Sequence, residues 1–113
     1  MLEDFQISGL TKMLNSKLLK SIYPMVDRIE VEPLEYNKNI LGGRSEMYYS
    51  VDIYLNDSDI TKSNMYEMGL DPNYIVGPLL LKFLNYLGGS SLEGTFYFNL
   101  FGPDGELIDS ELE

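Results

Sequence analysis

The stretch MYYSVDIYLN at residues 47–56 decides the predicted fold, because apolar and polar side chains alternate along it. The odd positions from 47 to 55 are all apolar and would face one side of a β-strand, while the even positions would face the other. The even positions are Tyr48, Ser50, Asp52 and Tyr54. The alternation predicts a strand with one side in a core and one side turned away from it.

A second strand is predicted upstream, over residues 26–36, where the same period of two recurs. Glu30 and Glu32 fall on its polar side. Pro33 has no N–H to donate to a β-ladder, which favours an edge strand or a bulge. The intervening residues 37–45 contain a pair of glycines and predict a loop, so the two strands should pair as an antiparallel hairpin.

An amphipathic helix is predicted before these strands, over residues 7–22. Its apolar stripe recurs every four residues, and lysines mark the solvent side. The stripe consists of Leu10, Leu14, Leu18 and Ile22. Pro24 would end the helix, because the residue before a proline avoids helical geometry.

Two further helices are predicted after the second strand. Residues 56–59 offer helix caps for a short helix from Asp59 to Met68, and Asp71-Pro72 is a second start signal. The following segment, residues 74–87, is apolar almost all round and predicts a buried helix. Pro78 within it either kinks this helix or marks its true beginning.

The C-terminal part predicts a second hairpin. Thr95–Phe101 and Glu106–Ile108 are strand-like, and the GPDG sequence at 102–105 is a strong turn signal. Residues 109–113 predict an acidic tail that follows one domain at 1–108. The predicted fold class is α+β: an antiparallel sheet of about four strands in two hairpins, with two to three helices on one face, in the order α-β-β-α(α)-β-β.

Composition limits the class of protein. A chain of 113 residues with 44% hydrophobic residues suits one hydrophobic core. It contains no cysteine, which excludes disulfides and thiolate metal sites and suits a reducing compartment. The first residues lack a secretory signal, and no apolar run has the roughly 18 residues of a membrane span. We therefore expect a cytoplasmic protein that does not bind a membrane.

Charge and residue types limit the chemistry. The net charge of −10 would repel phosphate backbones, so we expect no direct binding of nucleic acid. Because the chain has neither histidine nor cysteine, the two commonest neutral-pH bases and nucleophiles are missing. We expect no enzyme, no catalytic residues and no cofactor.

A metal site is the weakest of three hypotheses for a function. Asp57 and Asp59 form a D-x-D at the end of a predicted strand, where oxygen ligands can hold Mg²⁺ or Ca²⁺. The remaining ligands of a calcium loop are missing, and helix capping explains these residues without an ion. We predict no metal, and a divalent-metal-binding module stays an alternative.

The acidic side of the first hairpin gives a second hypothesis. Glu30, Glu32 and Asp52 would align on the sheet surface beside Tyr54. Rows of carboxylates on a rigid element can imitate nucleic-acid phosphates and inhibit a protein that binds DNA or RNA. A sheet that simply keeps one face in water would show the same alternation.

The tyrosines give the leading hypothesis. The chain has nine tyrosines and six methionines, residue types enriched in contact surfaces. Tyr48, Tyr54 and Tyr97 would face away from the core, and the chain has enough helix to cover only one side of its sheet. We therefore predict a non-catalytic protein–protein interaction protein or structural subunit, in a homo-oligomer or a larger assembly, with these tyrosines at the interface. By analogy of element order alone, it suits a bacteriophage accessory or virion protein, a viral protein found in the host cytoplasm or the virion.

Overall fold

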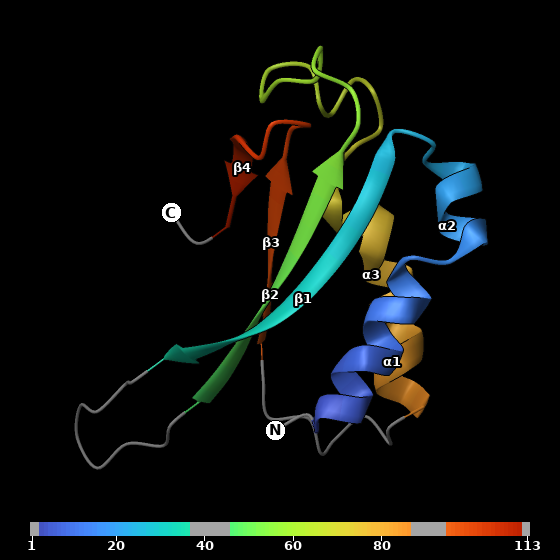
Figure 1. Ribbon diagram of the computed structural model, residues 1–113, viewed down its shortest axis with the longest axis vertical. Helices are drawn as coiled ribbons and strands as arrows, with labels where there is room; N and C mark the ends of the chain where they lie inside the picture. The colour runs from blue at the N-terminus through green and yellow to red at the C-terminus, as the bar shows by residue number, and fades with distance from the viewer. Residues whose placement is uncertain (1–2, 37–45, 87–94, 112–113) are drawn as a thin grey trace.

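The computed structural model of the chain describes residues 3–36, 46–86 and 95–111 and has an α+β fold (Figure 1). In chain order, the elements are α1 (Asp4–Leu14), α2 (Lys17–Ile22), β1 (Val26–Tyr36), β2 (Glu46–Leu55), α3 (Pro72–Tyr86), β3 (Thr95–Phe101) and β4 (Leu107–Ser110). The strands form one sheet in the order β1-β2-β3-β4, and the helices lie together on one of its faces. None of the helices in the described ranges is long and apolar enough to cross a bilayer.

The predicted hairpin of β1 and β2 is confirmed. The two strands pair antiparallel, with Ile29 opposite Ile53 and Val31 opposite Val51, and these side chains are buried under the helices. β1 lies at the edge of the sheet, as Pro33 indicated. The free edge is partly closed by Asn15, whose side chain accepts from the Ile29 N–H at 2.9 Å and donates to the Ile29 carbonyl at 2.7 Å. One amide thus replaces a neighbouring strand at this point.

The prediction of an antiparallel sheet was wrong at its centre. β2 and β3 run parallel, with Val51 beside Phe98. The reason is the path of α3, which carries the chain back across the helical face, so that β3 begins at the same end of the sheet as β2. β3 and β4 then form the predicted antiparallel hairpin, closed by a hydrogen bond of 3.0 Å from the Gly105 N–H to the Gly102 carbonyl, with Gly105 at φ 78°.

The prediction of one helix over residues 7–22 was also wrong. The chain breaks after Leu14, and Ser16 caps a new helix by accepting from the Leu19 N–H at 3.3 Å. The break changes the phase of the apolar stripe. Leu19 is buried, whereas Leu18 and Ile22, expected in the core, are 68% and 61% exposed.

The helix predicted from Asp59 to Met68 is not formed, and this segment consists of turns. Side chains take hydrogen bonds that a helix would need for its backbone: Asn64 accepts from the Thr61 N–H and donates to the Asp59 carbonyl, and Asp57 accepts from the Asp59 N–H. The turns still contribute Ile60, Met65 and Leu70 to the core.

Two details of the C-terminal half complete the comparison with the prediction. α3 begins at Pro72, directly after Asp71, as the second start signal indicated, and it continues through Pro78, so Pro78 is not its first residue. β4 extends to Ser110 and pairs with β3. Asp109 and Ser110, predicted as the start of an acidic tail, therefore belong to a strand. The predicted loop at 37–45 lies outside the described residues.

Candidate functional site

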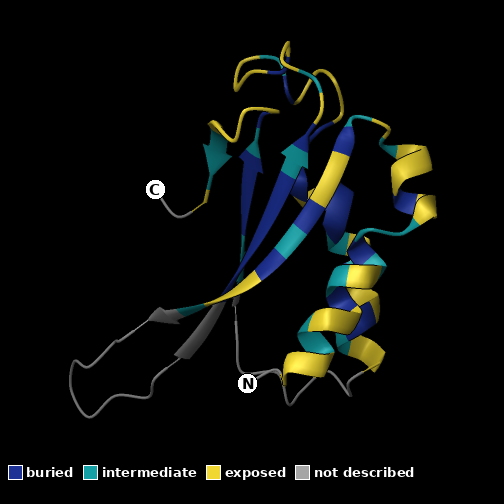
Figure 2. Cartoon of the chain, in the orientation of Figure 1, coloured by how far each residue is buried: buried dark blue, intermediate teal, exposed yellow. Residues whose placement is uncertain are grey.

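The face of the sheet that points away from the helices, called the open face below, is built from rows of side chains that cross the strands, and three of these rows have all their side chains described. Strand register places these residues in line, because directly opposite residues share a face. The three rows are Arg28–Tyr54–Phe101, Glu30–Asp52–Asn99–Ser110 and Glu32–Ser50–Tyr97. No helix of the described residues packs on this face, yet β2 is buried along most of its described length and β3 at its centre, Phe98 to Leu100 (Figure 2).

The middle of the open face is a buried network of polar side chains. Asp52 accepts at Oδ1 from the Ser50 hydroxyl at 2.6 Å and from the Asn99 amide at 2.9 Å. The same Asn99 amide donates to Ser50 Oγ at 2.8 Å, and the Ser110 hydroxyl donates to Asn99 Oδ1. Although no helix covers them, Asp52 is only 8% exposed, Ser50 4% and Asn99 6%.

An aromatic pair flanks this network on one side. The rings of Tyr54 and Phe101 stack at 4.8 Å between centroids, and the guanidinium of Arg28 lies 3.9 Å above the Tyr54 ring. Burial raises the pKa of the Tyr54 hydroxyl above its usual 10.0, and the charges of Glu30 and Asp52 and a hydrogen bond to Glu30 raise it further, against the opposing charge of Arg28. The surroundings thus favour the neutral hydroxyl of Tyr54 over its phenolate.

The other flank of the network carries Glu32 and Tyr97. Glu32 is exposed and Tyr97 is half-buried, with Ser50 between them in the register. The structure thus brings together two of the three tyrosines predicted for the interface, Tyr54 and Tyr97, on the face that alternation indicated. The side chain of Tyr48 lies outside the described part of the chain.

The three predicted acidic residues also share this face, but they do not present a row of free charges. Glu30 and Asp52 lie directly opposite each other in the register. Asp52 is enclosed in the network, and Glu30 Oε1 lies 3.5 Å from Arg28 Nε. Of the three, only Asp52 is enclosed: Glu32 is exposed, and the Glu30 side chain is 44% exposed beside Arg28.

The aspartates weighed as metal ligands lie in the turn after β2. Asp57 uses Oδ1 to accept from the Asp59 N–H at 2.9 Å, which is local turn chemistry. Within residues 3–36, 46–86 and 95–111, no three Asp, Glu, His or Cys side chains gather where they could hold a metal ion.

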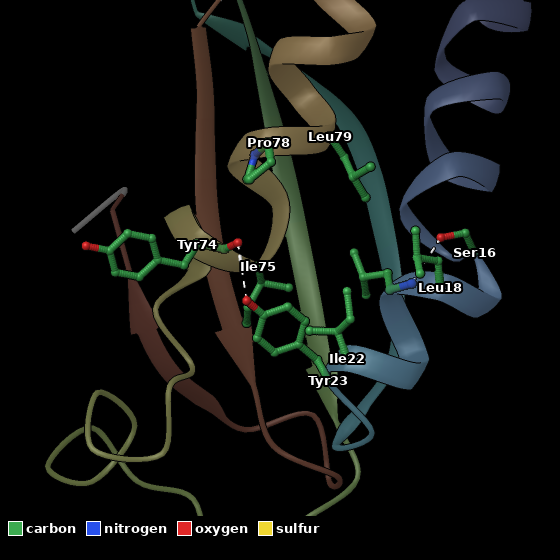
Figure 3. Close-up of a pocket in the computed structure, with 9 residues that line it drawn as sticks. Ser16, Leu18, Ile22, Tyr23, Tyr74, Ile75, Pro78 and Leu79 are labelled. Atoms are coloured by element: carbon green, nitrogen blue, oxygen red, sulfur yellow. Dashed lines mark hydrogen bonds between the residues drawn. The ribbon is translucent and has the colours of Figure 1, made fainter.

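A second surface, which the sequence interpretation missed, is an apolar groove between α2 and α3 of about 210 Å³ (Figure 3). Leu18 and Ile22 of α2 face Leu79 of α3 across it. The groove follows from the break after Leu14, because Leu18 and Ile22 belong to the core only if one helix continues through residue 22. The serine at 16, a preferred capping residue, was the signal that could have indicated a second helix start.

Comparison of the chain with protein families, with curated proteins and with solved structures finds no match in any of the three. A function is therefore inferred from the chemistry of the open face and of the groove.

Proposed function

We propose that this chain is a non-catalytic interaction or structural protein, and that its open face is covered by another protein chain. The observation that carries the proposal is the arrangement of aromatic side chains on both flanks of a buried polar network, on the side of the sheet opposite the helices. Tyrosine, phenylalanine and arginine are enriched in the centres of protein interfaces.

The network suits a surface that another protein buries. A polar group that loses water without finding a partner costs about 1–3 kcal/mol, which usually makes buried contact with a polar surface unfavourable. Ser50, Asp52 and Asn99 already satisfy one another. A partner can therefore cover them without removing much bound water. The free energy gained by burying the apolar surface of Tyr54, Tyr97 and Phe101 is then not offset by a desolvation cost.

The alternative of a nucleic-acid mimic has less support. Mimicry needs several exposed carboxylates at regular spacing, whereas Asp52 is enclosed and Glu30 is paired with Arg28. A metal-binding module has no support from Asp57, whose carboxylate is engaged by the Asp59 N–H.

The proposal is tested with Tyr97→Ala, which removes an aromatic side chain from the open face. The matched control is Tyr66→Ala, which removes an exposed tyrosine from the turns after β2. Sedimentation velocity on the purified chain and native mass spectrometry of the chain captured from its own source measure its complexes. We expect a stable complex for the wild type and for Tyr66→Ala, and an affinity lower by about tenfold to a hundredfold for Tyr97→Ala, the range of an interface hot spot.

Two results would contradict the proposal. One is a wild-type chain that stays monomeric at high concentration and is captured alone from its source. The other is a complex that Tyr97→Ala and Tyr66→Ala leave equally intact. Circular dichroism on both variants checks that the fold is kept.

A further inference from the structure

The groove between α2 and α3 is an exposed apolar surface on an otherwise strongly acidic chain. The buried Leu19 and Ile75 line its floor, Leu18 and Ile22 form the wall on the α2 side, and Leu79 lies on the α3 side. The ring of Tyr74 points away from α2, so the groove is open at that end (Figure 3). At about 210 Å³ it is smaller than the pockets of about 300–1,000 Å³ that hold drug-sized ligands, which favours the side chains of a protein as its occupant.

The two helices that form the groove carry positive charge only. α2 contributes Lys17 and Lys20, α3 contributes Lys82, and neither helix contains an aspartate or a glutamate. Lys82 follows Pro78 by four residues and Leu79 by three, which places it in line with the groove along α3. In the described ranges, no carboxylate lies within ion-pair distance of these three lysines. None of these lysines lines the groove itself, so its occupant should be apolar at the centre and carry acidic groups outside it, within reach of the two helices.

The open face of the same chain has that character. Tyr54, Tyr97 and Phe101 supply apolar area. The charged groups beside them that reach the surface are the carboxylates of Glu30 and Glu32 and the guanidinium of Arg28, while Asp52 is enclosed. The groove lies in the helical layer and the open face on the opposite side of the sheet. One copy of the chain can therefore use both surfaces at once, each with a different neighbour.

We infer that copies of this chain associate head to tail, with the basic apolar groove between α2 and α3 of one copy on the acidic aromatic open face of the next. The inference rests on the proposed function, because it names a second copy as the chain that covers the open face. A contact between two different surfaces is heterologous and leaves one surface of each kind free at the ends of a dimer. Such an assembly closes into a ring or grows as a filament.

The test uses two variants that each block one surface. Leu18→Glu places a carboxylate in the groove, where it repels the acidic open face, and Tyr97→Ala weakens the open face. Each variant alone is expected to sediment as a monomer of 12.9 kDa. Mixed at equal amounts, the intact open face of Leu18→Glu meets the intact groove of Tyr97→Ala, and we expect a dimer of one copy of each that does not grow further.

The matched control is Leu81→Glu, the same change at an α3 leucine that is 64% exposed, against 68% for Leu18, and that does not line the groove. It should assemble like the wild type. Circular dichroism and the melting temperature of Leu18→Glu check that its helices are intact.

The outcomes separate this inference from the proposed function. If Leu18→Glu assembles like the wild type while Tyr97→Ala does not, the open face is an interface but the groove is not its counterpart, and the inference is overturned. A mixture that stays monomeric overturns it as well. A wild-type chain that is monomeric alone but forms a complex sensitive to Tyr97→Ala with another protein overturns the inference and leaves the proposed function standing.

Discussion

Asn99 is the residue that ties the described open face together. Its single side chain donates to Ser50 and Asp52 on β2 and accepts from Ser110 on β4, so it links the central parallel pair of strands with the edge strand. The carboxylate of Asp52 is nearly enclosed, and a buried charge is tolerated only when hydrogen-bond donors surround it.

Replacement of Asn99 tests how much this network contributes to the free energy of unfolding. We expect Asn99→Ala to lower the free energy of unfolding by about 2–3 kcal/mol, because a buried carboxylate and two hydroxyls lose their shared partner. Asn85→Ala, at an exposed position of α3, should change it by less than about 0.5 kcal/mol. Urea denaturation measures both, and equal stability of the two variants would show that the network contributes little.

At the residue scale, alternation predicted which side chains share a face but not how they are buried. The period of two places Glu30, Tyr54 and Tyr97 together on the basis of local sequence. The enclosure of Asp52 depends on Asn99, which lies 47 residues along the chain and on a parallel neighbour. No local pattern contains that contact.

At the scale of elements, α3 contains an internal proline, and a side chain just after α2 supplies a hydrogen bond in place of the missing one. Pro78 has no N–H, so the carbonyl of Tyr74, four residues earlier, has no partner from that position. The hydroxyl of Tyr23, which follows α2, donates to this carbonyl at 3.4 Å (Figure 3). The interaction connects α3 to the end of α2 beside the groove.

A double-mutant cycle tests this replacement. We expect Tyr23→Phe to lower the free energy of unfolding by about 0.5–1 kcal/mol in the wild type, because the Tyr74 carbonyl loses its donor. In the Pro78→Ala background the same change should have almost no effect, since the new N–H at position 78 supplies the bond. Denaturation of the four proteins gives the coupling energy, and an equal loss in both backgrounds would contradict this account.

The elements were predictable where their signals are local. The GPDG turn and the β1–β2 hairpin follow from turn chemistry and alternation, and the capping serine at 16 carries the information for α2. Strand direction is different, because side chains alternate in the same way in parallel and antiparallel strands. Only the return path of α3 across the helical face makes β3 parallel to β2.

At the scale of the whole molecule, the two helices that form the groove and the open face differ in the sign of their charges. The helices α2 and α3 carry lysines and no carboxylates, whereas the open face carries mainly carboxylates and the whole chain has a net charge of −10. The chain could associate with itself in two ways, and the charges favour one of them and oppose the other. Head-to-tail contact brings a basic surface to an acidic one, while contact between two open faces brings Glu30 and Glu32 of one copy close to those of the other.

Salt therefore distinguishes these modes by the sign of its effect. Raising the salt concentration shortens the screening length from about 10 Å at 0.1 M to about 3 Å at 1 M. If the contact is head to tail, screening removes an attraction, and we expect the dissociation constant measured by sedimentation to rise about tenfold over this range. Lys82→Gln should reduce the slope, because it removes a positive charge in line with the groove. If two open faces meet, screening removes a repulsion and the dissociation constant must fall, so tighter association at high salt would exclude the head-to-tail arrangement even if Tyr97 proved essential.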